Sequence, residues 1–243
     1  MSEKPPRLFV DAPLRAGETV HLDKAQAHYL GHVMRRAVGD TVSLFNRGDG
    51  EFAATITQSR KQGMELALGP RARPALLPPD IDYCFAPLKS ARLDYMAQKA
   101  CEMGVRRLRP VMTQHTVAGR VNLERLFANV VEAAEQCEMT AVPEVLEPVT
   151  LDRLIAGWDS ARHLVFCDEG AAGAASLAAL QAIPKGPLAL LVGPEGGFSA
   201  SEQAMLRKLP YVTVLPLGPR ILRADTAAVA ALALLQSVAG DWQ

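Results

Sequence analysis

The sequence has few aromatic residues, no net charge and no long apolar run. Aromatic side chains make up 5% of its 243 residues, and 26 Lys and Arg balance 26 Asp and Glu. A neutral chain lacks the long-range attraction of polybasic proteins for nucleic acids or anionic membranes. The longest apolar stretches, residues 188–192 and 227–235, are far shorter than the roughly 20 residues that cross a bilayer. We therefore expect no transmembrane helix and no polybasic mode of binding.

Signals for secretion, disulfides and metal binding are also missing. The first ten residues, MSEKPPRLFV, contain two prolines and no extended apolar segment, so we expect a cytoplasmic protein. The four cysteines are scattered and form no CxxC pair, which predicts buried, reduced thiols. His28 and His32 are spaced to share a helix face, but no HExxH pattern contains them. We expect no metal site.

Two patterns divide the chain, and prolines 74, 78 and 79 interrupt both of them. Residues 1–73 hold an excess of three basic over acidic side chains and one helix pattern, over 24–36 with Asp23 as its N-cap. Strand-like segments occupy residues 7–10, 41–45, 51–57 and 64–68. We therefore expect a small β-barrel domain at 1–73, separate from a second domain at 74–243.

Residues 74–243 alternate between helical and strand-like segments. Apolar residues recur at helical spacing in 90–103 and 123–137. Short apolar strands are expected at 83–86, 108–112, 163–167, 188–192 and 211–215. This alternation is typical of an α/β domain with a parallel sheet.

The loops that follow the last two predicted strands are candidate ligand-binding loops, because open parallel sheets bind ligands beyond the carboxyl ends of their strands. The first reads GPEGGFS over 193–199 and leads into a capping box formed by Ser199 and Glu202. It is neither a Walker A loop nor GxGxxG, and Glu195 would repel a pyrophosphate. A ligand with an adenosine moiety, no phosphate and a positive centre fits better, which favours S-adenosylmethionine; a purely structural turn is the alternative.

The second loop reads LGPRILRADT over 217–226 and runs directly into an apolar helix pattern at 227–236. Asp225 or Thr226 can cap that helix. Two arginines beside a Gly-Pro pair at a strand end also favour a binding site. The helix is apolar on nearly every side, so we expect it to be buried within the domain or against a second subunit.

Six segments, in order along both domains, carry a resemblance to one enzyme family. They are RLFV (7–10), HYLGHVMRRAVGD (28–40), LKSARLDYMAQKACEMGV (88–105), EAAEQC (132–137), GPEGGFSASE (193–202) and LGPRILRADTAA (217–228). The chain resembles the RsmE family of SPOUT-type methyltransferases, which methylate uracil N3 in small-subunit (16S) ribosomal RNA. The resemblance implies a PUA-like β-barrel that helps bind RNA, then an α/β domain whose parallel sheet ends in a C-terminal trefoil knot. It also implies a homodimer that binds S-adenosylmethionine in the knot, with small-subunit ribosomal RNA as its substrate. The neutral charge of the chain favours the assembled 30S subunit as the form that is recognised, because shape and a few contacts can replace long-range attraction.

The resemblance also implies site residues. Cofactor-binding residues are expected at Leu191, Gly193, Pro194, Glu195, Gly197, Leu217, Gly218, Ile221, Leu222, Arg223 and Thr226. On the helix that carries EAAEQ, Glu132, Glu135 and Gln136 are expected near the substrate, although an ordinary solvated face is the alternative.

Methylation of uracil N3 requires loss of its proton and stabilisation of the resulting charge. Arg223 is the candidate for stabilising charge on a uracil carbonyl oxygen, while Asp225 or Glu195 would orient the base or accept the proton. Phe198 and Tyr29 are candidates for stacking on a base, with packing roles as the alternative. Contacts with RNA phosphates are expected from Arg7, Arg35 and Arg36.

The chain departs from the family pattern in two places. After EAAEQ the family usually has a small residue, Gly and Arg, where this chain has Cys137, Glu138 and Met139. In the loop after the strand that follows Gly104, Gln114 and His115 replace the usual Glu-Arg. Two other functions stay open at this point: a SPOUT methyltransferase that acts on another RNA position, such as a ribose 2′-hydroxyl, and a non-catalytic RNA-binding assembly factor.

Overall fold

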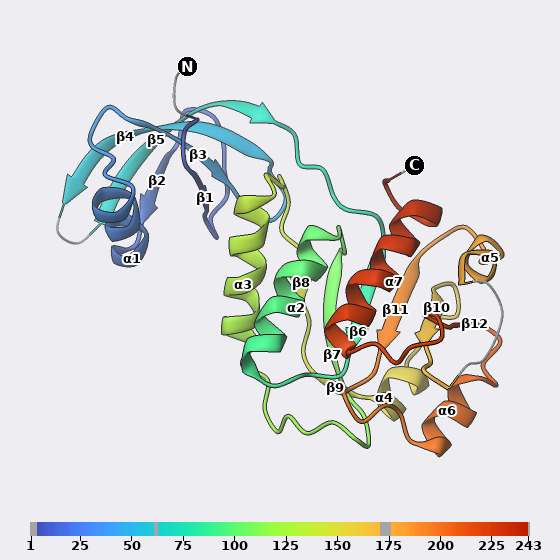
Figure 1. The fold of residues 1–243 in the computed structure, drawn as a ribbon. Helices are drawn as coiled ribbons and strands as arrows, with labels where there is room; N and C mark the ends of the chain where they lie inside the picture. The colour runs from blue at the N-terminus through green and yellow to red at the C-terminus, as the bar shows by residue number, and fades with distance from the viewer. Residues whose placement is uncertain (1–3, 61–62, 171–175, 243) are drawn as a thin grey trace. The chain divides into compact units, whose positions relative to one another are not determined.

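The computed structural model describes residues 4–60, 63–170 and 176–242. The chain forms two compact units, which Figure 1 colours along the sequence. The first unit comprises Met1–Leu77 together with Ala134–Val142, and the second comprises Pro78–Ala133 together with Pro143–Gln243. The chain therefore passes between the units three times. The sequence alone predicts a single boundary, after residue 73.

The first unit is built on a five-stranded sheet with the order β1-β3-β4-β5-β2. Its strands are β1 (Arg7–Phe9), β2 (Thr19–Leu22), β3 (Thr41–Phe45), β4 (Glu51–Arg60) and β5 (Gly63–Arg73). β1 pairs in parallel with β3, and the other pairs are antiparallel. Val20 and Leu22 of β2 are buried in the core of the unit, whereas the alternate residues Thr19 and His21 are exposed. This short strand was not predicted from the sequence.

The helix predicted over 24–36 is shorter than expected. α1 (Lys24–His28) begins at Asp23, whose carboxylate caps it as predicted, and continues as the π-helical turn η1 (Tyr29–Val33). Arg35 then adopts a left-handed conformation with φ +53°. Helices commonly end at a left-handed glycine. Because an arginine occupies this position, the sequence contains no signal for the end of the helix.

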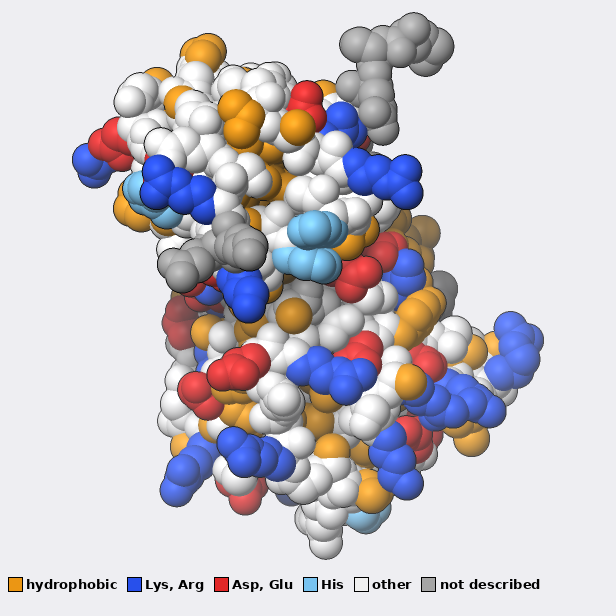
Figure 2. Space-filling view, turned by 90° about the vertical axis from the view of Figure 1, so that its left-hand side faces the viewer, with side chains coloured by type: hydrophobic (Ala, Val, Ile, Leu, Met, Phe, Trp, Pro, Cys, Tyr) orange, Lys and Arg blue, Asp and Glu red, His pale blue; other side chains and the backbone are white. Residues whose placement is uncertain are grey.

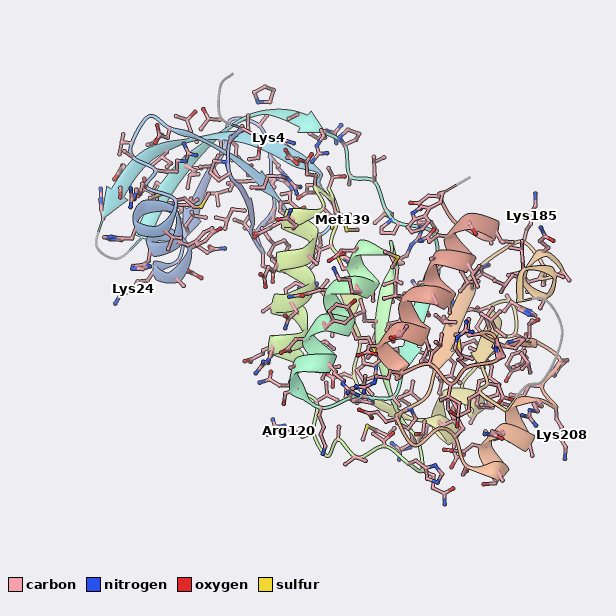
Figure 3. All side chains as sticks on the ribbon, viewed as in Figure 1. Lys4, Lys24, Arg120, Met139, Lys185 and Lys208 are labelled. Atoms are coloured by element: carbon pink, nitrogen blue, oxygen red, sulfur yellow. The ribbon has the colours of Figure 1, made fainter. Side chains whose placement is uncertain are left out.

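Residues 134–142 join the first unit through the guanidinium of Arg7. Arg7 donates hydrogen bonds to the carbonyl oxygens of Ala134 (3.1 Å), Glu135 (2.8 Å) and Met139, the last of which is labelled in Figure 3. The carboxylate of Glu135 in turn accepts a hydrogen bond from the backbone N–H of Phe9 (2.8 Å). Carbonyls at a helix end have no intrahelical donor, and here a cation satisfies them.

A carboxylate neutralises this buried arginine. Glu51 accepts a hydrogen bond from Arg7 Nε (3.1 Å), and its carboxylate also pairs with Arg73. The side chains of Arg7 and Glu51 are 7% and 9% exposed. Arg73 donates a further hydrogen bond to the carbonyl oxygen of Glu138 (2.9 Å). The turn after the helix is therefore held by two arginines that share one carboxylate.

The second unit contains a seven-stranded sheet with the order β12-β10-β11-β6-β7-β8, and β9 pairs with β7. The strands are β6 (Ile81–Phe85), β7 (Arg107–Met112), β8 (Glu144–Val145), β9 (Val149–Thr150), β10 (His163–Cys167), β11 (Leu188–Val192) and β12 (Val212–Leu215). Every pairing in the sheet is parallel. The predicted α/β domain with a parallel sheet is confirmed, while β8 and β9, with two residues each, are too short to show a pattern.

Helices cover the sheet of the second unit. They are α2 (Ser90–Glu102), α3 (Leu123–Gln136), α4 (Leu151–Ala156), α5 (Ser176–Gln181), α6 (Ala200–Leu206) and α7 (Ala224–Ala239). α2 and α7 pack against each other, and α7 also contacts β11 (Figure 1). Side chains of β10 and β11 that point to one face form a core cluster with α4 and α6. Burial on both faces explains why these strands are continuously apolar.

Helix α7 carries a buried glutamine that fixes its last turns. The side chain of Gln236 is fully buried, and its Nε2 donates to the carbonyl oxygens of Met103 (2.6 Å) and Gly104 (3.1 Å). Its Oε1 accepts from the backbone N–H of Asp241 (3.0 Å). No helix in the described part of the chain is both long and apolar enough to span a membrane.

Gln236→Leu is expected to lower the free energy of unfolding by about 1–3 kcal/mol, because it removes the partner of two partly buried carbonyls and of the Asp241 N–H. Urea denaturation measures the change. Ser237→Ala, at the exposed neighbouring position, is the control and is expected to stay within about 0.5 kcal/mol of the unmodified protein. An unchanged midpoint for Gln236→Leu would show that these hydrogen bonds add nothing to stability.

Candidate active site

A cavity of about 220 Å³ lies in the second unit, beyond the carboxyl ends of three neighbouring strands. Its walls come from the loops that follow β10, β11 and β12, with further residues from α6 and α7. Adjacent parallel strands end at the same edge of a sheet, so loops that are distant in sequence converge there. Both loops singled out in the sequence are part of this cavity.

The cavity brings together nine of the eleven residues expected to bind a cofactor. They are Gly193, Pro194, Glu195, Gly197, Leu217, Gly218, Ile221, Leu222 and Arg223. The other two lie elsewhere. Leu191 is fully buried in the core cluster, and Thr226 is exposed in the first turn of α7, where its backbone N–H donates to Asp225 (2.8 Å).

The first loop is shaped by close contacts at two glycines. A Cβ at Gly193 would lie 2.7 Å from the ring of Phe198, so this ring packs directly over the loop backbone. Phe198 also packs edge-on against Phe166, with ring centroids 5.0 Å apart, and is 7% exposed. Gly197 has φ +67°, a conformation that favours glycine. Phe198 therefore packs against the loop and Phe166, as the packing alternative expects, and its ring also lines the cavity.

The capping box predicted after this loop is confirmed. The backbone N–H of Ser199 donates to Glu202 (2.8 Å), and the Ser199 hydroxyl accepts from the Glu202 N–H (3.3 Å). This fixes the start of α6 directly behind the glycine-rich loop.

Helix α7 begins at Ala224, three residues before the predicted start at 227. Arg223, rather than Asp225 or Thr226, occupies the N-cap position, with φ −65° and ψ 151°. Asp225 lies in the first turn, where a carboxylate interacts favourably with the helix dipole. The predicted cap is wrong because the helix pattern begins at Ala224 and includes the two polar residues.

Two acidic residues after β10 line the cavity and were missed in the sequence. The side chain of Asp168 is fully buried and accepts a hydrogen bond (2.8 Å) from Nε of Arg207, the C-cap residue of α6. Glu169 forms no hydrogen bond or ion pair with another described residue, and a Cβ at Gly197 would overlap its carboxylate. A CDEG sequence directly after an apolar strand was the available signal.

Helix α2 contributes a further charged residue beside the cavity. Arg92 Nη1 lies 3.5 Å from Glu195 Oε1, and Arg92 Nε lies 4.0 Å from Asp225 Oδ2. Glu195 and Asp225 are the two carboxylates considered as proton acceptors. The structure therefore brings both carboxylates to the guanidinium of Arg92. The sequence did not predict that Arg92 contacts either of them.

The two departures from the family pattern lie in different environments. His115 Nδ1 lies 3.0 Å from the carbonyl oxygen of Gly196, and the Gln114 N–H donates to Glu202 (2.8 Å), so this loop fastens the glycine-rich loop. A carbonyl oxygen can only accept, so His115 Nδ1 carries the proton. Glu138 adopts φ +58°, a conformation in which the family's usual glycine is free of strain.

The cysteines have different environments. Cys84 and Cys101 are buried as expected, but Cys137 is exposed, which corrects the expectation for that residue. Cys167 is only partly buried and lines the cavity, which also departs from the expectation. Burial raises the pKa of the Cys84 and Cys167 thiols to about 12, so both are protonated near neutral pH. No cluster of three or more metal-ligating side chains occurs among the described residues.

The residues expected to contact RNA in the first unit occupy different environments. Arg35 is exposed, Arg36 is half-buried, and Tyr29 is 39% exposed on η1. Arg7 is buried and bonded through its N–H groups as described above, which corrects the expectation that it contacts phosphate. Figure 2 shows Lys and Arg interspersed with Asp and Glu on the face drawn, as a neutral chain would suggest.

On α3, Glu132 and Gln136 are exposed. Glu135 is instead used to bind the backbone of β1. The expectation that Glu135 lies near the substrate is therefore corrected.

The chemistry of the cavity is mixed. Val192, Leu215 and Leu222 supply apolar surface, whereas Glu169 and Glu195 supply carboxylates. Arg220 and Arg223 line the same space. Such a site fits a small ligand that combines an apolar ring system with groups of both charges.

Comparisons with known proteins cover both units. Residues 76–236 match the family described as an RNA methyltransferase domain, and residues 22–68 match an RNA methyltransferase PUA domain. The chain is 30% identical over 255 residues to ribosomal RNA small subunit methyltransferase E from Mycobacterium bovis, an alignment that covers 96% of this chain and 92% of that protein. It is 27% identical over 229 residues to the protein of the same name from Rickettsia conorii, with 93% of each covered.

A solved structure is similar over the full length. It is the crystal structure of a ribosomal RNA small subunit methyltransferase E from Neisseria gonorrhoeae bound to S-adenosyl methionine, with a TM-score of 0.88 and 26% identity. The similarity covers 99% of this chain and 100% of that chain.

Proposed function

The chain belongs to the family of ribosomal RNA small subunit methyltransferase E, and on that premise we propose that it methylates N3 of a uridine in 16S ribosomal RNA. The observation that carries this proposal is the cavity at the ends of β10, β11 and β12, lined by both glycine-containing loops. S-adenosylmethionine, when bound, supplies a methyl group on a positively charged sulfonium.

The lining residues fit S-adenosylmethionine in their chemistry. Apolar side chains such as Leu215 and Leu222 suit the adenine ring, and exposed backbone groups of the glycine loops can hydrogen-bond its edge. The carboxylates of Glu169 and Glu195 complement its positive charges, while Arg220 complements its carboxylate.

Three side chains have the chemistry that the uracil requires. The N3 lone pair is delocalised and N3 bears a proton, so the base must lose that proton as charge develops on its carbonyl oxygens. Arg223 donates hydrogen bonds to one of these oxygens and stabilises the charge. Glu195 lines the cavity and accepts the proton or orients the base, whereas Asp225 does not line it and supports this arrangement from α7.

The quaternary and topological features implied by the family are part of the proposal. The protein forms a homodimer, with the PUA-like domain as a barrel and the C-terminal segment as a trefoil knot. Ile221 lines the cavity and is 80% exposed, which is unusual for a large apolar side chain and supports a second subunit next to the site. The substrate is the assembled 30S subunit in the cytoplasm, where shape and a few contacts replace the long-range attraction that a neutral protein lacks.

Arg35 and Arg36 are proposed to contact RNA phosphates. The double variant Arg35→Gln/Arg36→Gln is expected to weaken binding to unmethylated small subunits and to reduce the slope of log K against log salt by between about one and two, since each phosphate contact adds roughly 0.7–0.9. Affinity for S-adenosylmethionine stays unchanged. Arg15→Gln, an exposed arginine of the same unit, serves as the control. A slope equal to that of the unmodified protein would contradict this assignment.

The direct test of the proposed function is transfer of label. The purified protein is incubated with S-adenosylmethionine labelled in its methyl group and with small subunits that lack the modification, and the digested RNA is analysed by mass spectrometry. Label in 3-methyluridine supports the proposal. Label in a ribose-methylated nucleoside identifies a different target, and cofactor binding without transfer to any RNA favours an assembly factor.

A further inference from the structure

Arg92 lies between two carboxylates, one from a loop and one from a helix. Glu195 belongs to the loop after β11, and Asp225 belongs to the first turn of α7. The two N–O distances, 3.5 Å and 4.0 Å, are longer than those of a tight ion pair, so the guanidinium is shared and not committed to either partner. Arg92 is 38% exposed, and the carboxylates are 41% and 17% exposed.

The neighbouring charged side chains of α2 behave differently. Lys99 pairs with Glu102 within the same helix, and Asp94 pairs with Arg125 of α3. These are ordinary surface pairs, which contribute little. Arg92 instead connects α2 to the loop after β11 and to the first turn of α7. Glu195 lies 103 residues from Arg92 in the sequence.

Geometry and charge explain why an arginine is needed at this place. A guanidinium presents five N–H donors in a planar fork and can serve two acceptors at once, whereas an ammonium group is a compact point charge. Without a cation between them, the carboxylates of Glu195 and Asp225 would repel each other across the cavity edge. That repulsion would push the two segments apart.

We propose that Arg92 is a positioning residue. Its contacts with Glu195 and Asp225, here called the clasp, hold the glycine-rich loop beside the first turn of α7 and keep the cavity in the shape that binds the cofactor. The inference rests on the proposed function, because it assigns Arg92 to the same cavity. Arg92 acts through Glu195 and Asp225 and is not required to touch the ligand.

The clasp is tested by calorimetry with two ligands and no RNA. Arg92→Lys keeps the charge but loses the fork, and Arg92→Gln loses both. Because the clasp shapes the cavity, both variants are expected to raise the Kd of S-adenosylmethionine and of S-adenosylhomocysteine by the same factor, about tenfold for Arg92→Gln. Arg125→Gln, which removes an exposed arginine that pairs with α2, is the matched control and is expected to change neither Kd by more than twofold.

The two ligands separate positioning from simple charge. S-adenosylmethionine carries a sulfonium and S-adenosylhomocysteine does not, so a purely electrostatic effect of Arg92 would tighten the first relative to the second when the cation is removed. That outcome, or an unchanged Kd for both ligands, would overturn the clasp. If the unmodified protein binds neither ligand, the proposed function itself fails and the clasp with it.

A double-mutant cycle adds an independent measurement. In a Glu195→Gln/Asp225→Asn background, Arg92→Gln is expected to have less than a twofold further effect on Kd, because its two partners are already gone. A full tenfold effect in that background would show that Arg92 acts by another route. Circular dichroism of each variant excludes unfolding as the cause.

Discussion

Arg223→Ala is expected to lower the rate of methyl transfer by about 10²–10³ while the Kd of S-adenosylmethionine changes by no more than a few fold. Its side chain lines the cavity and makes no hydrogen bond or ion pair with another described residue, so its donors are available to a substrate. Removal of one preorganised donor from a site of developing negative charge typically costs this factor. The backbone carbonyl of Arg223 accepts the first hydrogen bond of α7 (2.7 Å from the Ala227 nitrogen), and an alanine retains that contact.

Single-turnover kinetics on unmethylated small subunits measure this effect without a contribution from product release. Arg153→Ala, an exposed arginine on α4, is the control for loss of one positive charge from the same unit. Arg223→Lys is expected to recover part of the rate, because it restores the charge without the planar fork. Near-normal turnover of Arg223→Ala with normal cofactor affinity would eliminate Arg223 as the group that stabilises the uracil anion.

Glu51→Gln is expected to destabilise the first unit by about 3–5 kcal/mol, the cost of removing one partner from a buried ion pair. Glu51 is the carboxylate that neutralises the buried Arg7 and also pairs with Arg73. The amide cannot offset either charge. Hydrogen exchange of the amides in β1 and β3 reports the opening of this unit separately from the other. Glu18→Gln, in an exposed pair with Arg15, is the control and is expected to cost less than about 1 kcal/mol.

The same carboxylate predicts how stability depends on pH. Burial acts to raise the pKa of Glu51, but hydrogen bonds and the charges of Arg73 and Arg7 outweigh it and lower the pKa below its ordinary value of 4.5. A carboxyl whose pKa is lowered by folding stabilises the native state above its unfolded pKa, and this contribution disappears as pH falls through the folded pKa. The difference in stability between the unmodified protein and Glu51→Gln should therefore shrink below about pH 4.5. A difference that stays constant down to pH 3 would contradict this role.

Local patterns in the sequence predicted the elements that build the cavity. β10 and β11 are buried at nearly every position, so their apolar residues form continuous runs that stand out from the surrounding sequence. The glycine loop and the capping box at Ser199 and Glu202 depend on residues within a few positions of one another. Such short-range features can be predicted from the sequence because only a few residue types favour the backbone conformation that they require.

Elements without a local signal were missed or misplaced. The end of the helix at Arg35 and the turn at Glu138 use left-handed residues that are not glycine. β2, β8 and β9 are too short to establish a period. In these places the surrounding structure imposes a conformation that the residue itself does not favour.

The sequence by itself determined that this protein has an α/β domain with a parallel sheet and two loops suited to a cofactor at its carboxyl edge. Only the tertiary structure decided which charged side chains meet. Arg92 reaches Glu195 from 103 residues away, and Arg7 binds carbonyls 127–132 residues away. The sequence gives the charge and the hydrogen-bond donors of each side chain. Its partner depends on which distant part of the chain the fold brings next to it. For that reason Arg7, expected on the RNA, is found holding a helix end, and Arg92, to which the sequence assigned no role, is found beside the cavity.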